Sequence, residues 1–193
     1  MVASLGIALL MFLGAWVISV VVPQTHDEYF PIFSHGGDFH DMMWILIRNL
    51  MVLLMHLLVC IAAYLSRRAV PMQAKHFKGV NRWVHEHAGS FAMAIVAGLT
   101  AYSLCFQAWE LGLSLHDAAA TMNMSSSSLL IRAALHGIPE LTAIFLPLAA
   151  CLILGHEKRW NELAAVSIFT AIISVPMLIA AAAVETYVTH GLF

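Results

Sequence analysis

Hydrophobic and polar positions follow one another along this chain in long blocks, without the short repeat of an amphipathic helix or strand. Each apolar block holds about 20 residues, which is the length that a helix needs to cross a bilayer. Five segments qualify, namely 5–22, 42–65, 88–109, 129–154 and 163–187. We therefore predict an all-α membrane bundle of about five transmembrane helices, with residues 1–193 forming a single transmembrane domain.

The composition supports a membrane protein surrounded by the lipid bilayer. Hydrophobic residues make up 61% of the chain and charged residues 10%, whereas soluble domains average about half and a quarter. The mean hydropathy is +0.85. A net charge of −2 without a basic face argues against nucleic acid as a partner. We expect the first segment to be a retained helix, because no basic residue precedes it and no small-residue cleavage site follows it.

The basic residues predict how the helices are oriented. The connections after the second and fourth segments hold most of the Lys and Arg, while those after the first and third hold acidic residues and no basic ones. Because basic loops stay in the cytoplasm, we predict a cytoplasmic N-terminus and an external C-terminus. The residues that decide this are Arg67, Arg68, Lys75, Lys78, Arg82, Lys158 and Arg159.

Several polar side chains fall inside the predicted spans, where they are costly. His136 and Glu140 are four residues apart, so they share one helical face. At 1.5 Å per residue, His136 lies roughly 10 Å below the outer end of its span. Arg48 and Asn49 lie at about the same depth on the second span. Lipid cannot solvate such groups, so we predict a polar chamber that opens outward. The other groups expected near it are Arg48, Asn49, Gln107, Glu110, Arg132 and Glu185, with Pro139, Pro147 and Pro176 as possible kinks.

These residue types are suited to metal chemistry. His136, Glu140 and Glu185 could bind one Zn²⁺ ion and leave a fourth position for water, as in catalytic zinc sites. Bound water is a nucleophile at neutral pH. Arg48 or Asn49 could then stabilise the oxyanion, which makes these two residues and Glu140 the candidate catalytic groups. The pattern predicts a metal-dependent peptidase or peptide ligase acting near the outer membrane surface.

Two other interpretations stay open. The same side chains could form a hydrogen-bonded network that holds helices together, with Arg132 beside His136 and with Glu185 paired to Arg48. Alternatively, Glu140, His136 and a deeper histidine could conduct protons or ions. Further candidate histidines are His56 on the second span and His26, His35 and His40 in the first outer loop, and the three loop histidines could add ligands.

Three stretches of the chain resemble the stage II sporulation protein M family. They are His136-Gly-Ile-Pro-Glu140-Leu, Arg48-Asn49-Leu and Ala-Val-Glu185-Thr-Tyr-Val-Thr189, and the likeness extends from about the second span to the end. Two features depart from the family. The Asn-Gly-rich connection between helices is missing from the middle of the chain, and the outer loops are rich in His.

The resemblance implies a multi-pass protein of a bacterial or archaeal cytoplasmic membrane. The family's namesake looks like an anchor for peptidoglycan-remodelling enzymes in sporulation, and similar short proteins accompany circular bacteriocins, whose apolar peptides they are suspected of maturing, cyclising or exporting. The resemblance therefore leaves room for a non-catalytic scaffold or export component beside the enzyme. Its partner would be an apolar peptide, another membrane protein or a further copy of the chain.

Overall fold

The computed structural model describes residues 1–22 and 38–189, and within these ranges every regular element is helical. The long helices are α1 (Val2–Val21), α2 (Phe39–Tyr64), α4 (Gly79–Thr121), α5 (Ser126–Ile144), α6 (Leu146–His156) and α7 (Leu163–Val184). The short elements are a π-helical turn η1 (Leu65–Ala69), helix α3 (Val70–Ala74) and a second π-helical turn η2 (Glu185–Thr189).

The predicted all-helical bundle is confirmed, and the length and composition of its helices are compatible with a membrane. Four helices are long and apolar enough to cross a bilayer, and the pair formed by α5 and α6, bent by 44°, brings the number to five. The greatest difference from the prediction is the length of α4. It has 43 residues where the hydropathy predicted a span over 88–109. At 1.5 Å per residue α4 is about 65 Å long, roughly twice the hydrocarbon thickness of a bilayer.

The ends of α4 are set by backbone conformation. Gly79 at its start has a φ of 59°, in the left-handed region. At its end Asn123 is also left-handed, with a φ of 52°. The amide of Met124 then bonds to the carbonyl of Ala119 at 2.9 Å, and that of Asn123 to Ala120 at 3.2 Å, which is the pattern of a Schellman cap. The helix therefore continues past the apolar block, through the more polar residues 110–121, and ends at this cap.

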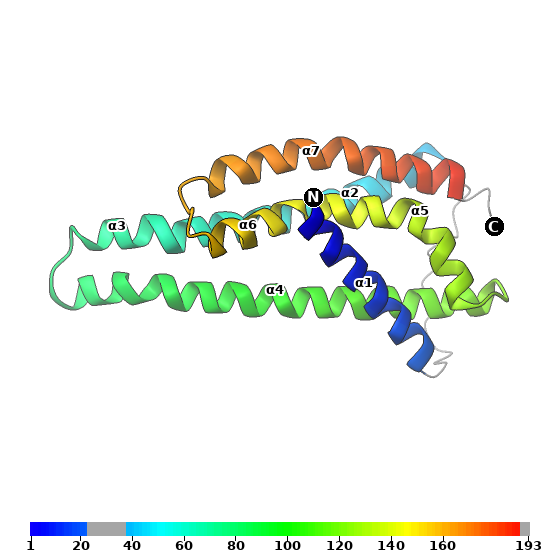
Figure 1. Ribbon diagram of the computed structural model, residues 1–193, viewed down its shortest axis with the longest axis horizontal. Coiled ribbons are helices and arrows are strands. Elements are labelled where there is room, and N and C mark those ends of the chain that lie inside the picture. Colours follow the sequence, from blue (N-terminus) through cyan, green and yellow to red (C-terminus); the bar gives the residue numbers. More distant parts are fainter. Residues whose placement is uncertain (23–37, 190–193) are drawn as a thin grey trace.

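The helices are arranged around a core between α1, α2, α5 and α7, while α4 lies along one side and α1 crosses it obliquely (Figure 1). The core contains Ala8, Met11, Leu46, Leu53, Ala143, Ile144, Phe145, Leu148, Leu178 and Ala182. Helix α4 contributes little to it. In the most apolar 18-residue stretch of α4, 6% is buried, against 28% in the corresponding stretches of α1, α2 and α7. Most of the surface of α4 is thus free to face lipid or a partner.

The bend between α5 and α6 lies at Phe145, two residues before Pro147. Proline has no N–H, so Pro147 cannot donate to the carbonyl of Ala143. The hydroxyl of Ser174 on α7 donates to that carbonyl instead, at 2.6 Å, and both groups are buried. Of the three prolines expected to kink helices, only Pro147 adjoins a break, because Pro139 and Pro176 lie inside continuous helices.

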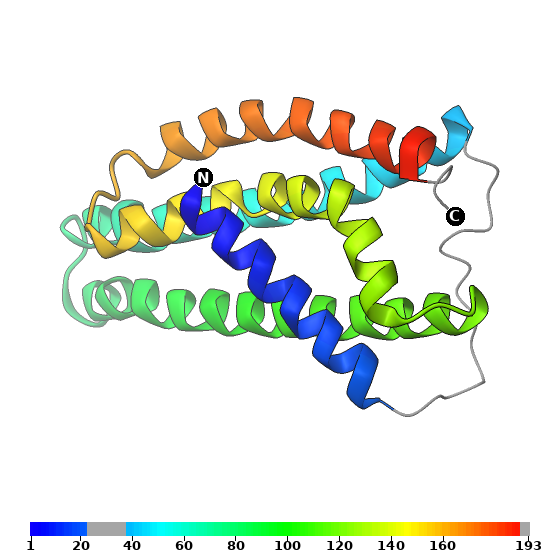
Figure 2. The same ribbon diagram turned by 45° about the vertical axis from the view of Figure 1, so that its right-hand side comes forward.

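The connections that carry the basic residues lie at one end of the bundle. The α3–α4 turn and the α6–α7 loop are together at that end, and the α4–α5 turn is at the other (Figures 1 and 2). This arrangement agrees with helices that run alternately up and down.

Candidate functional site

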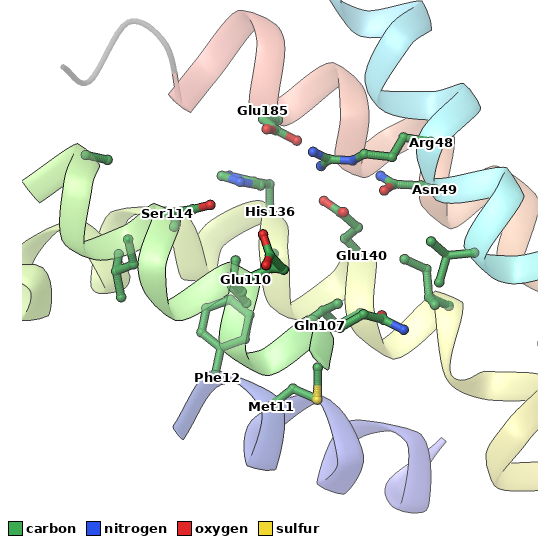
Figure 3. A pocket seen from close by; sticks show the side chains of 18 of the residues that line it. Met11, Phe12, Arg48, Asn49, Gln107, Glu110, Ser114, His136, Glu140 and Glu185 are labelled. Carbon is green, nitrogen blue, oxygen red and sulfur yellow. The ribbon is translucent and has the colours of Figure 1, made fainter. Parts of the chain in front are cut away.

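The predicted metal ligands come together in space. His136 and Glu140 lie one turn apart on α5, and Glu185 approaches them from the start of η2. One ligand atom from each of the three lies within 4.8 Å of the others. His136 and Glu140 are buried and Glu185 is half-buried. Their side chains point into one space between the two helices, as Figure 3 shows.

The backbone is irregular on both sides of this group. Glu185 is the first residue of a π-helical turn, a feature that occurs frequently at functional sites. On α5, Pro139 stands between the two ligands and cannot donate to the carbonyl of Leu135. The helix is therefore held at this level partly by its neighbours, and it can present the His136 and Glu140 side chains to the same space.

Helix α2 supplies a positive charge and an amide to the same space. The Arg48 guanidinium attracts the carboxylates of both Glu140 and Glu185. Asn49, which is buried, points toward Glu140 (Figure 3). Two ionised carboxylates beside one guanidinium leave one negative charge uncompensated. An unbalanced charge in a membrane is unfavourable, so this group favours a bound proton or cation.

Two buried polar atoms in the group lack a hydrogen-bond partner among the described residues. They are Nδ2 of Asn49 and Oε2 of Glu185. Leaving a buried donor or acceptor unpaired costs about 1–3 kcal/mol. Such atoms around one cavity indicate a place for a group that is not part of the chain, such as an ion, water or substrate.

A cavity of about 370 Å³ adjoins the group, and side chains from five helices line it. The expected Gln107 and Glu110 of α4 are among them. The sequence did not point to Met11, Phe12 and Ser114, which also line the cavity. The first two belong to α1, which has no ionisable side chain. Small residues mark the packed face of α1, but they do not show which part of that face lines the cavity.

Glycine at position 137 lets α1 close one side of this cavity. A Cβ atom there would lie 2.6 Å from Cζ of Phe12, much nearer than atoms normally approach. Gly137 comes directly after His136 in the chain, so the contact fixes α1 against the turn of α5 that carries the ligands. In the sequence, the glycine at position 137 is the feature that indicates a close contact with another helix.

The remaining candidates lie elsewhere. Arg132 is exposed and does not line the cavity. His56 is buried below the group, where its Nδ1 lies 3.0 Å from the carbonyl of Val52. His40 is in the first turn of α2, in a second cluster of potential ligands with Asp38 and Asp41. That cluster is mostly exposed, and its two aspartates cap the helix, with the Asp41 amide 2.9 Å from Asp38 Oδ1. His26 and His35 lie outside the described residues.

Comparison with family models, curated proteins and solved structures gives no match for this chain. The resemblance to the stage II sporulation protein M family stays a prediction. The residues that carry it are nevertheless the ones that gather in space, since Arg48 and Asn49, His136 and Glu140, and Glu185 come from its three separate stretches.

Proposed function

We propose that this chain is a metal-dependent membrane enzyme that acts on an amide bond, with Zn²⁺ bound by His136, Glu140 and Glu185. The observation that carries the proposal is the convergence of these three ligand atoms within 4.8 Å from two different helices. Imidazole nitrogen and carboxylate oxygen are both zinc ligands, and catalytic zinc sites have three protein ligands and a further position for water. A divalent cation would also offset the excess negative charge of the group.

The chemistry follows from the neighbours of the three ligands. A zinc ion held by these residues would lower the pKa of a bound water and so supply a nucleophile for the substrate carbonyl carbon at neutral pH. Arg48 and the unpaired Nδ2 of Asn49 lie on the α2 side, where they can donate to the developing oxyanion. The C–N bond then breaks, and a proton from the water passes to the departing amine. An amine in place of water would give ligation, so peptide cleavage and peptide cyclisation are both within reach of this site.

The proposal includes an orientation. With the basic connections in the cytoplasm, the N-terminus is cytoplasmic, the C-terminus is external, and the site lies in the outer half of the membrane. The enzyme would then act on substrates at the external face of a bacterial or archaeal cytoplasmic membrane, which fits a role in peptide maturation.

A non-catalytic scaffold is the second candidate, and the exposure of α4 favours it. This helix is about 65 Å long and its apolar part is almost wholly unburied, so it offers a long surface to another membrane protein. In a scaffold the cluster of His136, Glu140 and Glu185 would serve to hold α5 against α7.

Elemental analysis of the purified protein separates the two candidates. We expect about one zinc or similar divalent ion per chain, since three protein ligands hold the ion firmly. His136→Ala removes the only nitrogen ligand, so metal content should fall to background. Glu140→Gln and Glu185→Gln should each reduce it strongly.

His56→Ala is the matched control, because His56 is also a buried histidine but lies outside the ligand group. It should retain the metal. Helical content, measured by circular dichroism, and elution as a single species must be unchanged in the variants for the comparison to count. Wild-type protein that contains no metal after purification with zinc present would contradict the enzyme and leave the scaffold.

A further inference from the structure

A second cavity, of about 440 Å³, lies between α2 and α4. We call it the α2–α4 groove. Its lining on α2 runs from Met51 to Ala62 and on α4 from Val96 to Gln107. Val52 and Gln107 line both this groove and the cavity beside the metal ligands. The two spaces are therefore neighbours along the same pair of helices.

The groove is apolar and open to its surroundings. Among its lining residues only His56, Thr100, Ser103 and Gln107 are polar. Met51, Met55, Leu58 and Leu99 are each at least 50% exposed. In a bilayer these side chains face hydrocarbon, so a molecule dissolved in the membrane can enter the groove from the side.

The length of the groove suits one hydrocarbon chain. From Met51 to Ala62, the part of α2 that lines the groove, the helix advances about 17 Å at 1.5 Å per residue, and Arg48 lies about one turn beyond Met51. One leaflet of a bilayer has a hydrocarbon depth of roughly 15 Å, half of its total thickness. A membrane acyl chain is thus short enough to lie fully in the groove while its polar end reaches the level of Arg48.

The width and polarity of the groove argue against a peptide. A helix about 10 Å across and 20 Å long would need roughly 1,600 Å³, more than the empty space of about 1050 Å³ in the groove. An extended peptide would be thin enough, but its backbone N–H and C=O groups require partners inside a membrane. Four polar side chains along the groove do not supply them.

We infer that the α2–α4 groove binds a single hydrocarbon chain of the substrate, so that the substrate is an amide carrying one acyl chain. The chain enters laterally between α2 and α4 and places the amide group beside Arg48, His136 and Glu140. This inference rests on the proposed function for the chemistry at the site. The binding of the chain itself depends only on the groove.

Photocrosslinking in the purified full-length protein tests the inference. The probe is hexadecanamide with a diazirine in its tail, and crosslinked positions are mapped by mass spectrometry. We expect adducts on the α2 and α4 residues that line the groove. Val96→Trp, which fills the groove, should reduce them at least about tenfold, because excluding even two methylenes costs roughly that factor.

Ile95→Trp is the control, since Ile95 neighbours Val96 in sequence but does not line the groove. It should leave crosslinking unchanged. Equal labelling of both variants, or displacement of the probe by a leucine-rich transmembrane peptide as readily as by unlabelled hexadecanamide, would overturn the inference.

Metal content measured on the same samples distinguishes the two claims. If zinc is bound and crosslinking is spread over the protein surface, the inference fails and the proposed enzyme survives. If wild-type protein contains no metal, the proposed enzyme fails, and with it the assignment of the bound chain to a substrate.

Discussion

At the scale of single residues, the candidate site depends on groups that a membrane does not tolerate alone. Two carboxylates, an imidazole and an amide stand within the apolar segments, and each is costly in hydrocarbon. Arg48 offsets part of the charge, yet Asn49 Nδ2 and Glu185 Oε2 stay without a hydrogen-bond partner among the described residues. These unpaired atoms, together with the uncompensated charge of the two carboxylates, are why we favour a bound ligand.

The contact between Gly137 and Phe12 leads to a prediction about stability. Gly137→Ala places a Cβ atom 2.6 Å from Cζ of the Phe12 ring. The ring has to shift, and overpacking of this kind costs about 1–3 kcal/mol. For a chain of this size we expect the apparent Tm to fall by several degrees, at about 2–4 °C per kcal/mol. Thermal unfolding in detergent, followed by circular dichroism, measures the change.

Gly98→Ala serves as the control, because a Cβ atom at Gly98 meets nothing within 4 Å. It should be neutral or stabilising, as alanine is the better helix former. In a Phe12→Ala background the cost of Gly137→Ala should disappear. A Gly137→Ala variant as stable as Gly98→Ala would show that the ring moves freely and that α1 does not hold this turn of α5.

The proposed metal ligands could be picked out from the sequence because ionisable side chains are rare in apolar segments. His136, Glu140 and Glu185 are ionisable groups in apolar segments, and a helical spacing of four placed the first two on one face. Met11 and Phe12 carried no such signal, because α1 has no ionisable side chain. Small residues mark the packed face of α1, but only the structure places these two beside the cavity.

At the scale of the elements, one buried hydrogen bond joins α7 to the bend between α5 and α6. Pro147 leaves the Ala143 carbonyl without its helical donor, and Ser174 on α7 replaces it at 2.6 Å. The bend and the partner helix thus depend on each other. Because α7 continues into η2, this bond also helps to position Glu185.

Removing the hydroxyl of Ser174 should therefore destabilise the bundle. Ser174→Ala leaves a buried carbonyl unpaired, and hydrogen bonds between membrane helices contribute about 0.6 kcal/mol on average, with a maximum near 1.7. We expect a lower apparent Tm in detergent and weaker zinc retention. Pro147→Ala in the same chain restores an N–H for Ala143, so the double variant should recover much of the loss.

Thr142→Val is the matched control for the loss of a buried hydroxyl. The Thr142 hydroxyl is buried without a hydrogen-bond partner among the described residues. Removing it should cost little or even stabilise the protein. If Ser174→Ala and Thr142→Val had equal effects, the bond to Ala143 would have no special role.

The extent of α4 shows where hydropathy fails as a guide to elements. Hydropathy marks the part of a helix that can lie in lipid. It therefore predicted a span over 88–109 and left out the polar turns on either side. Those turns stay helical because nothing interrupts them before Gly79 and Asn123, where the backbone becomes left-handed. The approximate number of long apolar segments and their helical structure were predictable from hydropathy. The ends of α4 were not, because they depend on Gly79 and Asn123.

At the scale of the whole molecule, the distribution of basic residues is the main guide to orientation. The α3–α4 turn and the α6–α7 loop share one end of the bundle (Figure 1). Arg159 in the latter is exposed and lies 2.8 Å from Glu157. Its side-chain hydrogen bond to Glu162, aided by its charge, holds the pKa of Glu162 below its ordinary value. Acidic residues count little in the positive-inside rule, so these pairs do not alter the predicted orientation.

The two ends of α4 allow this orientation to be tested with a single helix. In a chain whose Cys60, Cys105 and Cys151 are replaced by alanine, we introduce either Lys78→Cys or Thr121→Cys, both at exposed positions. A membrane-impermeant maleimide applied to intact cells should label Thr121→Cys nearly completely. Lys78→Cys should react only after the membrane is disrupted. The reverse result would place the metal ligands in the cytoplasmic half of the membrane, and labelling of both positions in intact cells would mean that α4 does not cross the bilayer.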